Sequence, residues 1–143
     1  MCYCTHIVLL HCAYCYTHKA AFNARSEASL EGLRLIITHP GISLKDLSSA
    51  LTIAFRVGDM RVAKLILDRA DAGVILSRAR SQCWLVRATE LGNIGVMQRL
   101  LELGADIGYV SRSSRMTASM VAVRNNNMPA FTLLALTRDT AGQ

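Results

Sequence analysis

The fold is decided by one stretch of the sequence, Leu91-Gly92-Asn93-Ile94-Gly95-Val96-Met97-Gln98-Arg99-Leu100-Leu101-Glu102-Leu103-Gly104-Ala105-Asp106-Ile107. Within it, Val96, Leu100 and Leu101 recur at the spacing of one face of a helix. Gly92 suits the left-handed conformation that ends a preceding helix, and Asn93 is a residue type that caps the start of the next one. The stretch therefore predicts a tight turn between two helices.

This stretch belongs to one of three copies that lie 34 residues apart in the sequence. The equivalent segments are Ala54-Phe55-Arg56-Val57-Gly58-Asp59, Ala88-Thr89-Glu90-Leu91-Gly92-Asn93 and Ala122-Val123-Arg124-Asn125-Asn126-Asn127. A fainter fourth copy lies upstream, at Ala24, Ala28, Ile36-Ile37 and Pro40-Gly41. A fixed period of this length indicates a protein built from structural repeats.

Each copy has room for two short helices joined by a tight turn. In the second copy a first helix is expected over residues 49–56, followed by Gly58-Asp59 and a second helix that contains Val62 and Ile66. Such a helical hairpin cannot bury its apolar face alone, so neighbouring copies must stack. The residues expected to fill the resulting core are Leu51, Ile66, Leu85, Val96, Leu100, Val121 and Leu134.

The pattern resembles the ankyrin repeat. The resemblance rests on Ala-x-x-x-Gly-[Asp/Asn], a Val three residues later, a Leu-Leu pair and Gly104-Ala105-Asp106-Ile107, and it covers roughly residues 20–140. It implies an all-α fold, an α-solenoid of about four stacked helix-turn-helix repeats with short connecting β-turn fingers. The expected division is an N-terminal segment, 1–18, and a repeat domain, 19–143, with approximate repeats 19–45, 46–79, 80–113 and 114–143.

The opening tetrad of each copy departs from the family pattern. Ankyrin repeats usually open with Thr-Pro-Leu-His, which caps and braces the first helix. The corresponding tetrads here are Ser49-Ala50-Leu51-Thr52, Cys83-Trp84-Leu85-Val86 and Thr117-Ala118-Ser119-Met120, without Pro or His. This loss lowers the regularity and stability expected of the stack. The tetratricopeptide repeat has the same period and is the alternative, but its aromatic positions are not met.

Composition narrows the class of protein. The 143 residues are 52% hydrophobic and carry a formal net charge of +6, a combination that excludes intrinsic disorder. The longest uncharged stretch, residues 1–18, is interrupted by His and Thr and lacks the features of a signal peptide. A soluble, cytoplasmic chain with no membrane span is therefore expected.

The first 18 residues carry a cluster with metal-binding spacing. Four cysteines fall there together with three histidines, namely Cys2, Cys4, Cys12, Cys15, His6, His11 and His18. Cys12 and Cys15 have the C-x-x-C spacing of a tetrahedral zinc site, so a zinc or redox regulator is one hypothesis. A hydrophobic cap over the first repeat, with cysteines acting as small apolar residues, is favoured, and a poorly ordered segment is the third interpretation. Zinc is not expected to be required for folding.

Catalytic signatures are missing from the sequence. There is no Gly-x-Gly-x-x-Gly, Walker A loop, Gly-x-Ser-x-Gly or His-Glu-x-x-His. Cys83 opens a predicted helix, where a thiol pKa can be lowered, but no histidine follows His39 to act as its base. A structural Cys83 is favoured over a nucleophile. The chain is expected to be no enzyme, to use no cofactor and to bind no small-molecule substrate.

The resemblance places partner binding on the fingers and on the concave face beside them. The expected fingers, 43–47, 76–81 and 110–115, carry the basic residues Lys45, Arg78, Arg80, Arg112 and Arg115. Arg78 and Arg112 are 34 residues apart and would stack roughly 10 Å from each other on neighbouring fingers. Trp84 is the residue expected to anchor a partner on the concave face.

The predicted function is a protein–protein interaction module of the adaptor, scaffold or effector type. Arginine can hold a carboxylate with two hydrogen bonds, so the expected partner is another protein with an acidic surface. The alternative is a nucleic-acid or anionic-surface binder that uses the same arginines. It is less favoured because aromatic residues for base stacking are few.

Overall fold

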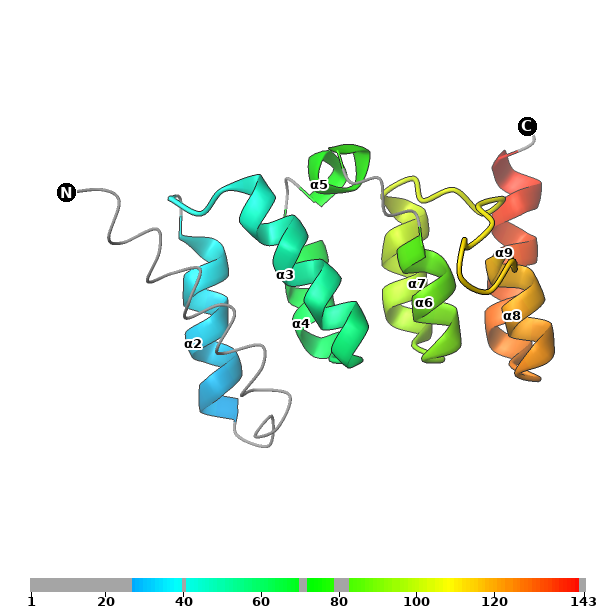
Figure 1. Ribbon diagram of the computed structural model, residues 1–143, viewed down its shortest axis with the longest axis horizontal. Coiled ribbons are helices and arrows are strands. Elements are labelled where there is room, and N and C mark those ends of the chain that lie inside the picture. Colours follow the sequence, from blue (N-terminus) through cyan, green and yellow to red (C-terminus); the bar gives the residue numbers. More distant parts are fainter. Residues whose placement is uncertain (1–26, 40, 70–71, 79–82, 142–143) are drawn as a thin grey trace. The chain divides into compact units, whose positions relative to one another are not determined.

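The computed structural model describes residues 27–39, 41–69, 72–78 and 83–141, and these residues form helices and connecting turns without any strand (Figure 1). The predicted all-α class is confirmed for this part of the chain. None of the helices described there is long and apolar enough to cross a lipid bilayer. The chain divides into two compact units, Met1–Asp71 and Ala72–Gln143.

The first unit contains a helical hairpin and a third helix packed on it. Helices α3 (Leu44–Val57) and α4 (Met60–Leu67) form the hairpin, and α2 (Glu27–Thr38) packs on α4. The Arg69 guanidinium, just beyond α4, donates a hydrogen bond to the carbonyl oxygen of Ile37 in α2. This bond ties the end of the hairpin to the neighbouring helix.

Helix α3 begins earlier than the sequence pattern predicted. The expected first helix of this copy was 49–56, whereas α3 starts at Leu44 because Ser43 caps it. The Asp46 backbone N–H donates to Ser43 Oγ over 3.2 Å, and Ser43 Oγ donates to Asp46 Oδ2 over 2.6 Å. The predicted finger over 43–47 is therefore wrong, since these residues form the first turn of a helix.

The second unit contains two successive helical hairpins. Helix α5 (Ala72–Arg78) precedes the hairpin of α6 (Cys83–Glu90) and α7 (Ile94–Glu102), and the next hairpin consists of α8 (Ala118–Arg124) and α9 (Met128–Ala141). Helix α8 packs on α6, and α9 packs on α7 (Figure 1). The first helix of one copy thus lies against the first helix of the next, and the second helix against the second.

The three hairpin turns share one backbone geometry. The left-handed positions predicted at 34-residue intervals are Gly58, Gly92 and Asn126, with φ of 87°, 70° and 53°. The next residue donates its backbone N–H to the carbonyl five positions back in every copy. These bonds are Asp59 to Ala54 at 2.9 Å, Asn93 to Ala88 at 3.2 Å and Asn127 to Ala122 at 2.9 Å. The repetition seen in the sequence is therefore also a repetition of conformation.

The predicted N-caps of the second helices are confirmed as well. The side-chain oxygen of Asn93 accepts from the Val96 N–H at 3.0 Å, and that of Asn127 accepts from the Ala130 N–H at 3.1 Å. Asp59 accepts from the N–H groups of Arg61 and Val62. Each cap satisfies a donor that the first turn of a helix leaves unpaired.

The predicted core residues are all buried. These are Leu51, Ile66, Leu85, Val96, Leu100, Val121 and Leu134. Ile66, Leu100 and Leu134 are separated by 34 residues and occupy equivalent places in the second helix of each copy. Burial of such side chains is the main source of stability for short helices, which are marginal in isolation.

Candidate interaction surface

The turn between α7 and α8 presents two exposed arginines. The Ser111 N–H donates to the Met116 carbonyl at 3.0 Å, and the Arg115 N–H donates to the Ser111 carbonyl at 2.8 Å. Ser111 itself is buried, whereas Arg112 and Arg115 are exposed. The finger predicted over 110–115 is therefore a closed turn in the structure, and we call it the basic turn.

Arg115 adopts a backbone conformation that is uncommon for its residue type. Its φ is 57°, in the left-handed region, where the Cβ of an L-residue crowds the following carbonyl oxygen. The hydrogen bond from Arg115 to Ser111 holds the residue in this conformation. Strained backbone of this kind concentrates at functional sites, which makes the basic turn a candidate for binding.

The other basic residues of the predicted fingers are placed differently. Lys45 is exposed, but it lies in the first turn of α3 rather than on a loop. Arg78 is the last residue of helix α5, so the finger predicted over 76–81 is wrong for residues 76–78. The side chain of Arg78 and all of Arg80 lie outside the described residues. The predicted stacking of Arg78 on Arg112 therefore stays a prediction.

Trp84 does not form part of an accessible surface. Its exposed fraction is 2%, and it lies among the buried residues of α6. A partner cannot contact the indole ring in this conformation. The prediction that Trp84 anchors a partner is therefore wrong, and the residue contributes to the core.

Cys83 opens helix α6 as predicted, but the helix end does not activate it. The residue is exposed, while partial burial of its thiol group outweighs a backbone hydrogen bond and raises the pKa of the thiol. A raised pKa leaves less thiolate, the nucleophilic form, at neutral pH. The hypothesis of a reactive Cys83 is contradicted by the direction of this shift.

The cysteine and histidine cluster of residues 1–18 lies outside the described residues, as does the predicted N-terminal cap. This covers Cys2, Cys4, Cys12 and Cys15 together with His6, His11 and His18. Within the described part of the chain, no three His, Cys, Asp or Glu side chains come together in a group that could hold a metal ion. The zinc hypothesis therefore keeps its standing as a hypothesis.

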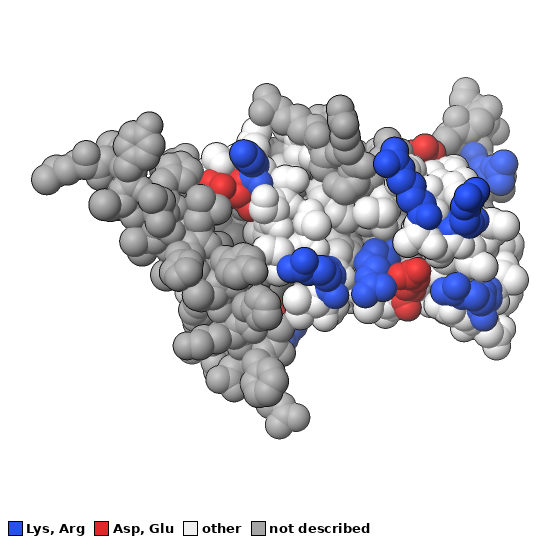
Figure 2. Space-filling model, in the orientation of Figure 1, with Lys and Arg blue, Asp and Glu red and all other residues white. Residues whose placement is uncertain are grey.

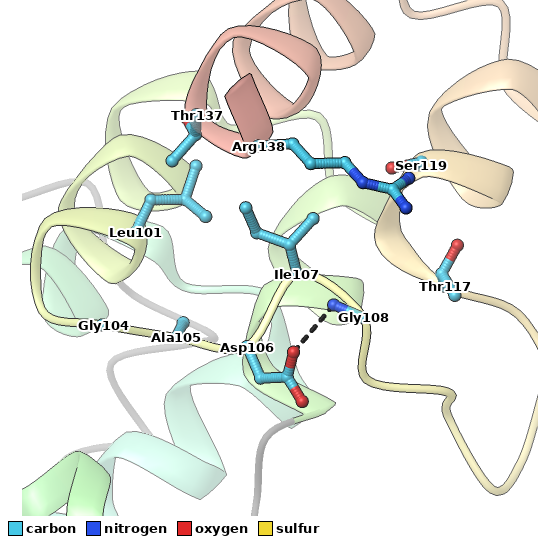
Figure 3. A pocket seen from close by; sticks show the side chains of 10 residues that line it. All are labelled: Leu101, Gly104, Ala105, Asp106, Ile107, Gly108, Thr117, Ser119, Thr137 and Arg138. Atoms are coloured by element: carbon cyan, nitrogen blue, oxygen red, sulfur yellow. Dashed lines mark hydrogen bonds between the residues drawn. The ribbon is translucent and has the colours of Figure 1, made fainter. Parts of the chain in front are cut away.

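A pocket of about 590 Å³ opens beside the basic turn, within the second unit (Figure 3). Its walls come from the end of α7, the turn 104–108, the start of α8 and the end of α9. Leu101 and Ile107 line it with apolar surface, while Ser119 and Arg138 supply polar groups. Asp106 accepts a hydrogen bond from the Gly108 N–H at 2.8 Å, which shapes the turn.

The sequence reasoning missed this pocket and Arg138. The small residues Gly104, Ala105 and Gly108 are a signal that could have been used, because they leave room beside the turn. The position of Arg138 had no such signal, since it depends on how α9 packs on α7.

Charge is distributed unevenly over the described residues of the second unit. Arg87 pairs with Glu90 at 2.7 Å and Arg99 with Glu102 at 3.1 Å, each within one helix. No ion pair with another described residue involves the exposed side chains Arg112, Arg115, Arg124 and Arg138. Figure 2 shows basic atoms over the α8 and α9 end of this face with little acidic surface among them. This surface suits an acidic partner.

Comparison with known proteins returned no match: no family model, no curated protein and no solved structure is similar to the chain. The functional argument therefore rests on the geometry of the chain itself.

Proposed function

We propose that this chain is a non-enzymatic protein–protein interaction module built from divergent ankyrin-like repeats. The observation that supports the proposal most strongly is the recurrence of one turn at 34-residue intervals, with the same left-handed residue, N-cap and hydrogen bond. Repeats of this kind offer extended surfaces for binding rather than enclosed sites for chemistry.

The basic turn is the part of the module that we assign to partner recognition. Arg112 and Arg115 project from a turn that two backbone hydrogen bonds hold closed. A preorganised turn loses less conformational entropy on binding than a flexible loop would. Two guanidinium groups without a described ion pair can each accept a carboxylate, so we infer that the partner is a protein with an acidic surface.

A nucleic acid fits the same charges less well. Single-stranded nucleic acids bind where basic side chains alternate with exposed aromatic rings that stack on bases. Burial of Trp84 removes the tryptophan from that role. Tyr109, beside the basic turn, is only partly exposed. These observations favour a protein partner.

The proposal is tested by affinity capture from cells followed by mass spectrometry. Wild-type chain is compared with Arg112→Glu/Arg115→Glu and with Arg34→Glu/Arg56→Glu, a control that makes the same change in net charge at exposed helix positions of the first unit. We expect the first variant to lose the captured protein and the control to retain it. Equal capture by all three chains would contradict the role of the basic turn.

A further inference from the structure

The α8/α9 hairpin leaves large apolar side chains in solvent. Met120 and Val123 of α8 are 54% and 63% exposed, and Met128 and Phe131 of α9 are 62% and 38% exposed. A spacing of three residues places the members of each pair on one side of their helix. Isolated exposed apolar residues are ordinary, but two adjoining helices that each carry a pair form a surface that water solvates poorly. We call these four residues the α8/α9 face.

The preceding copy shows what the equivalent face does. Val86, Thr89 and Met97 stand 34 residues before Met120, Val123 and Phe131, and their exposed fractions are 3%, 0% and 0%. They belong to the hairpin of α6 and α7, on which α8 and α9 pack. The α8/α9 face thus occupies positions that, one copy earlier, are covered by a further pair of helices. No described helix covers it.

The charges beside this face indicate what kind of helix would cover it. Arg124 lies one turn after Met120 on α8, and Arg138 lies two turns after Phe131 on α9. Both arginines are exposed, and no acidic side chain that the structure describes lies on either helix. A second copy of this chain would bring the same arginines and a net charge of +6 against them. Charge complementarity therefore favours a partner with acidic flanks.

The pocket at one end of the face provides a place for an acidic side chain. Ser119 and Arg138 both line it, and Figure 3 shows the Arg138 side chain reaching from α9 over the pocket towards the start of α8. A carboxylate placed there could accept two hydrogen bonds from the guanidinium group and a third from the Ser119 hydroxyl. Leu101 and Ile107 would exclude water from these bonds.

We propose that the α8/α9 face docks an amphipathic helical segment of a partner protein, with an apolar stripe over the four residues and an acidic residue at Arg138. The inference rests on the proposed function, because it assigns a second binding surface to the same interaction module. It differs from the basic turn in that apolar burial supplies most of the affinity and the arginines set its specificity.

The test uses the full chain with methyl-labelled methionines and a defined probe. The probe is a synthetic amphipathic helix with a leucine stripe flanked by glutamates, and its matched control has lysines in place of the glutamates. We expect the acidic peptide to shift the methyl resonances of Met120 and Met128, while that of Met60 in the first unit stays unchanged. Phe131→Glu and, separately, Met120→Glu should each weaken binding by about tenfold or more. Arg138→Gln should weaken it by roughly threefold.

The matched control variant is Leu35→Glu, which places the same charge at an exposed leucine of α2. It should leave the affinity unchanged, and circular dichroism should show equal helix content in all variants. Equal binding of the lysine-flanked peptide, or an equal loss in Leu35→Glu, would overturn the inference. A dimer in sedimentation that Met120→Glu dissociates would also overturn it, because the occupant would then be a second copy. If the peptide fails to bind while capture still depends on Arg112 and Arg115, the proposed function stands without this docking face.

Discussion

Leu100 carries the packing argument at the scale of single residues. It is fully buried at the position that Ile66 and Leu134 occupy in the neighbouring copies. Leu100→Ala removes buried apolar surface and leaves a cavity, so the free energy of unfolding should fall by about 2–5 kcal/mol. Leu136→Ala, at an exposed position of α9, should lower it by less than about 0.5 kcal/mol. Urea denaturation followed by circular dichroism measures both, and equal losses would contradict the assigned core.

Arg115 offers a second residue-scale test, because its backbone conformation and its charge have opposite consequences. Glycine at this left-handed position removes the Cβ contact, so Arg115→Gly should raise the free energy of unfolding by roughly 0.5–1 kcal/mol. The same change should weaken partner binding, since a guanidinium group is lost. Arg112→Gly, at a position without a positive φ, is the control and should not stabilise the chain. A less stable Arg115→Gly variant would show that the strain is absent.

The Cys83 thiol gives a pH-dependent prediction. Its pKa is raised by desolvation, so a smaller fraction is thiolate near pH 7 than in the unfolded chain. In a chain whose Cys2, Cys4, Cys12 and Cys15 are replaced by serine, iodoacetamide should alkylate Cys83 more slowly in the folded state than in urea. The rate should continue to increase as the pH rises above the usual range of a thiol pKa. Faster alkylation of the folded chain at neutral pH would contradict the direction of the shift.

At the scale of helices and turns, the N-caps are the features on which the hairpins depend. Asn93 accepts from the Val96 N–H, a donor that has no partner within the helix. Asn93→Ala should lower the free energy of unfolding by about 1 kcal/mol, and Asn127→Ala should lower it by a similar amount. Asn125→Ala, an exposed turn residue of the third copy, serves as the control in thermal denaturation. A cap variant as stable as this control would contradict the assigned role.

The turns could be predicted from the sequence because their signals are local. Glycine or asparagine at a left-handed position, followed by Asp or Asn as a cap, fixes the conformation of a few neighbouring residues. The start of α3 was missed because the repeat frame placed a finger there. The local pair Ser43 and Asp46, three residues apart, already carried the pattern of a helix N-terminus. Local chemistry was the better guide at that position.

The errors at the candidate site have a different physical origin. Whether Trp84 is buried or exposed depends on the helices that pack around α6, and no short pattern in the sequence records that packing. The pocket beside the basic turn depends equally on the position of α9 relative to α7. The exposed turn with Arg112 and Arg115 was predicted because its residues are polar and lie between two strongly periodic segments.

At the scale of the whole molecule, the account describes a chain of repeats whose function lies on its surface. Its second unit combines the basic turn, which attracts acidic groups, with the α8/α9 face, which offers apolar contact. Association between complementary charges is faster at low salt, whereas apolar burial mainly lengthens the life of the complex. The two surfaces should therefore be separable by measuring association and dissociation rates.

The most direct test of protein recognition by the basic turn is the salt dependence of binding to the captured partner protein. Affinity is measured for wild type and Arg112→Glu/Arg115→Glu between about 50 and 200 mM salt, with a DNA duplex as the comparison ligand. The account predicts that wild type binds the protein with a modest decrease over this range, and that the variant binds more weakly at low salt with a shallower decrease. Equal binding by the two chains at low salt, or stronger binding to the DNA with a loss of about a thousandfold over the same range, would contradict it.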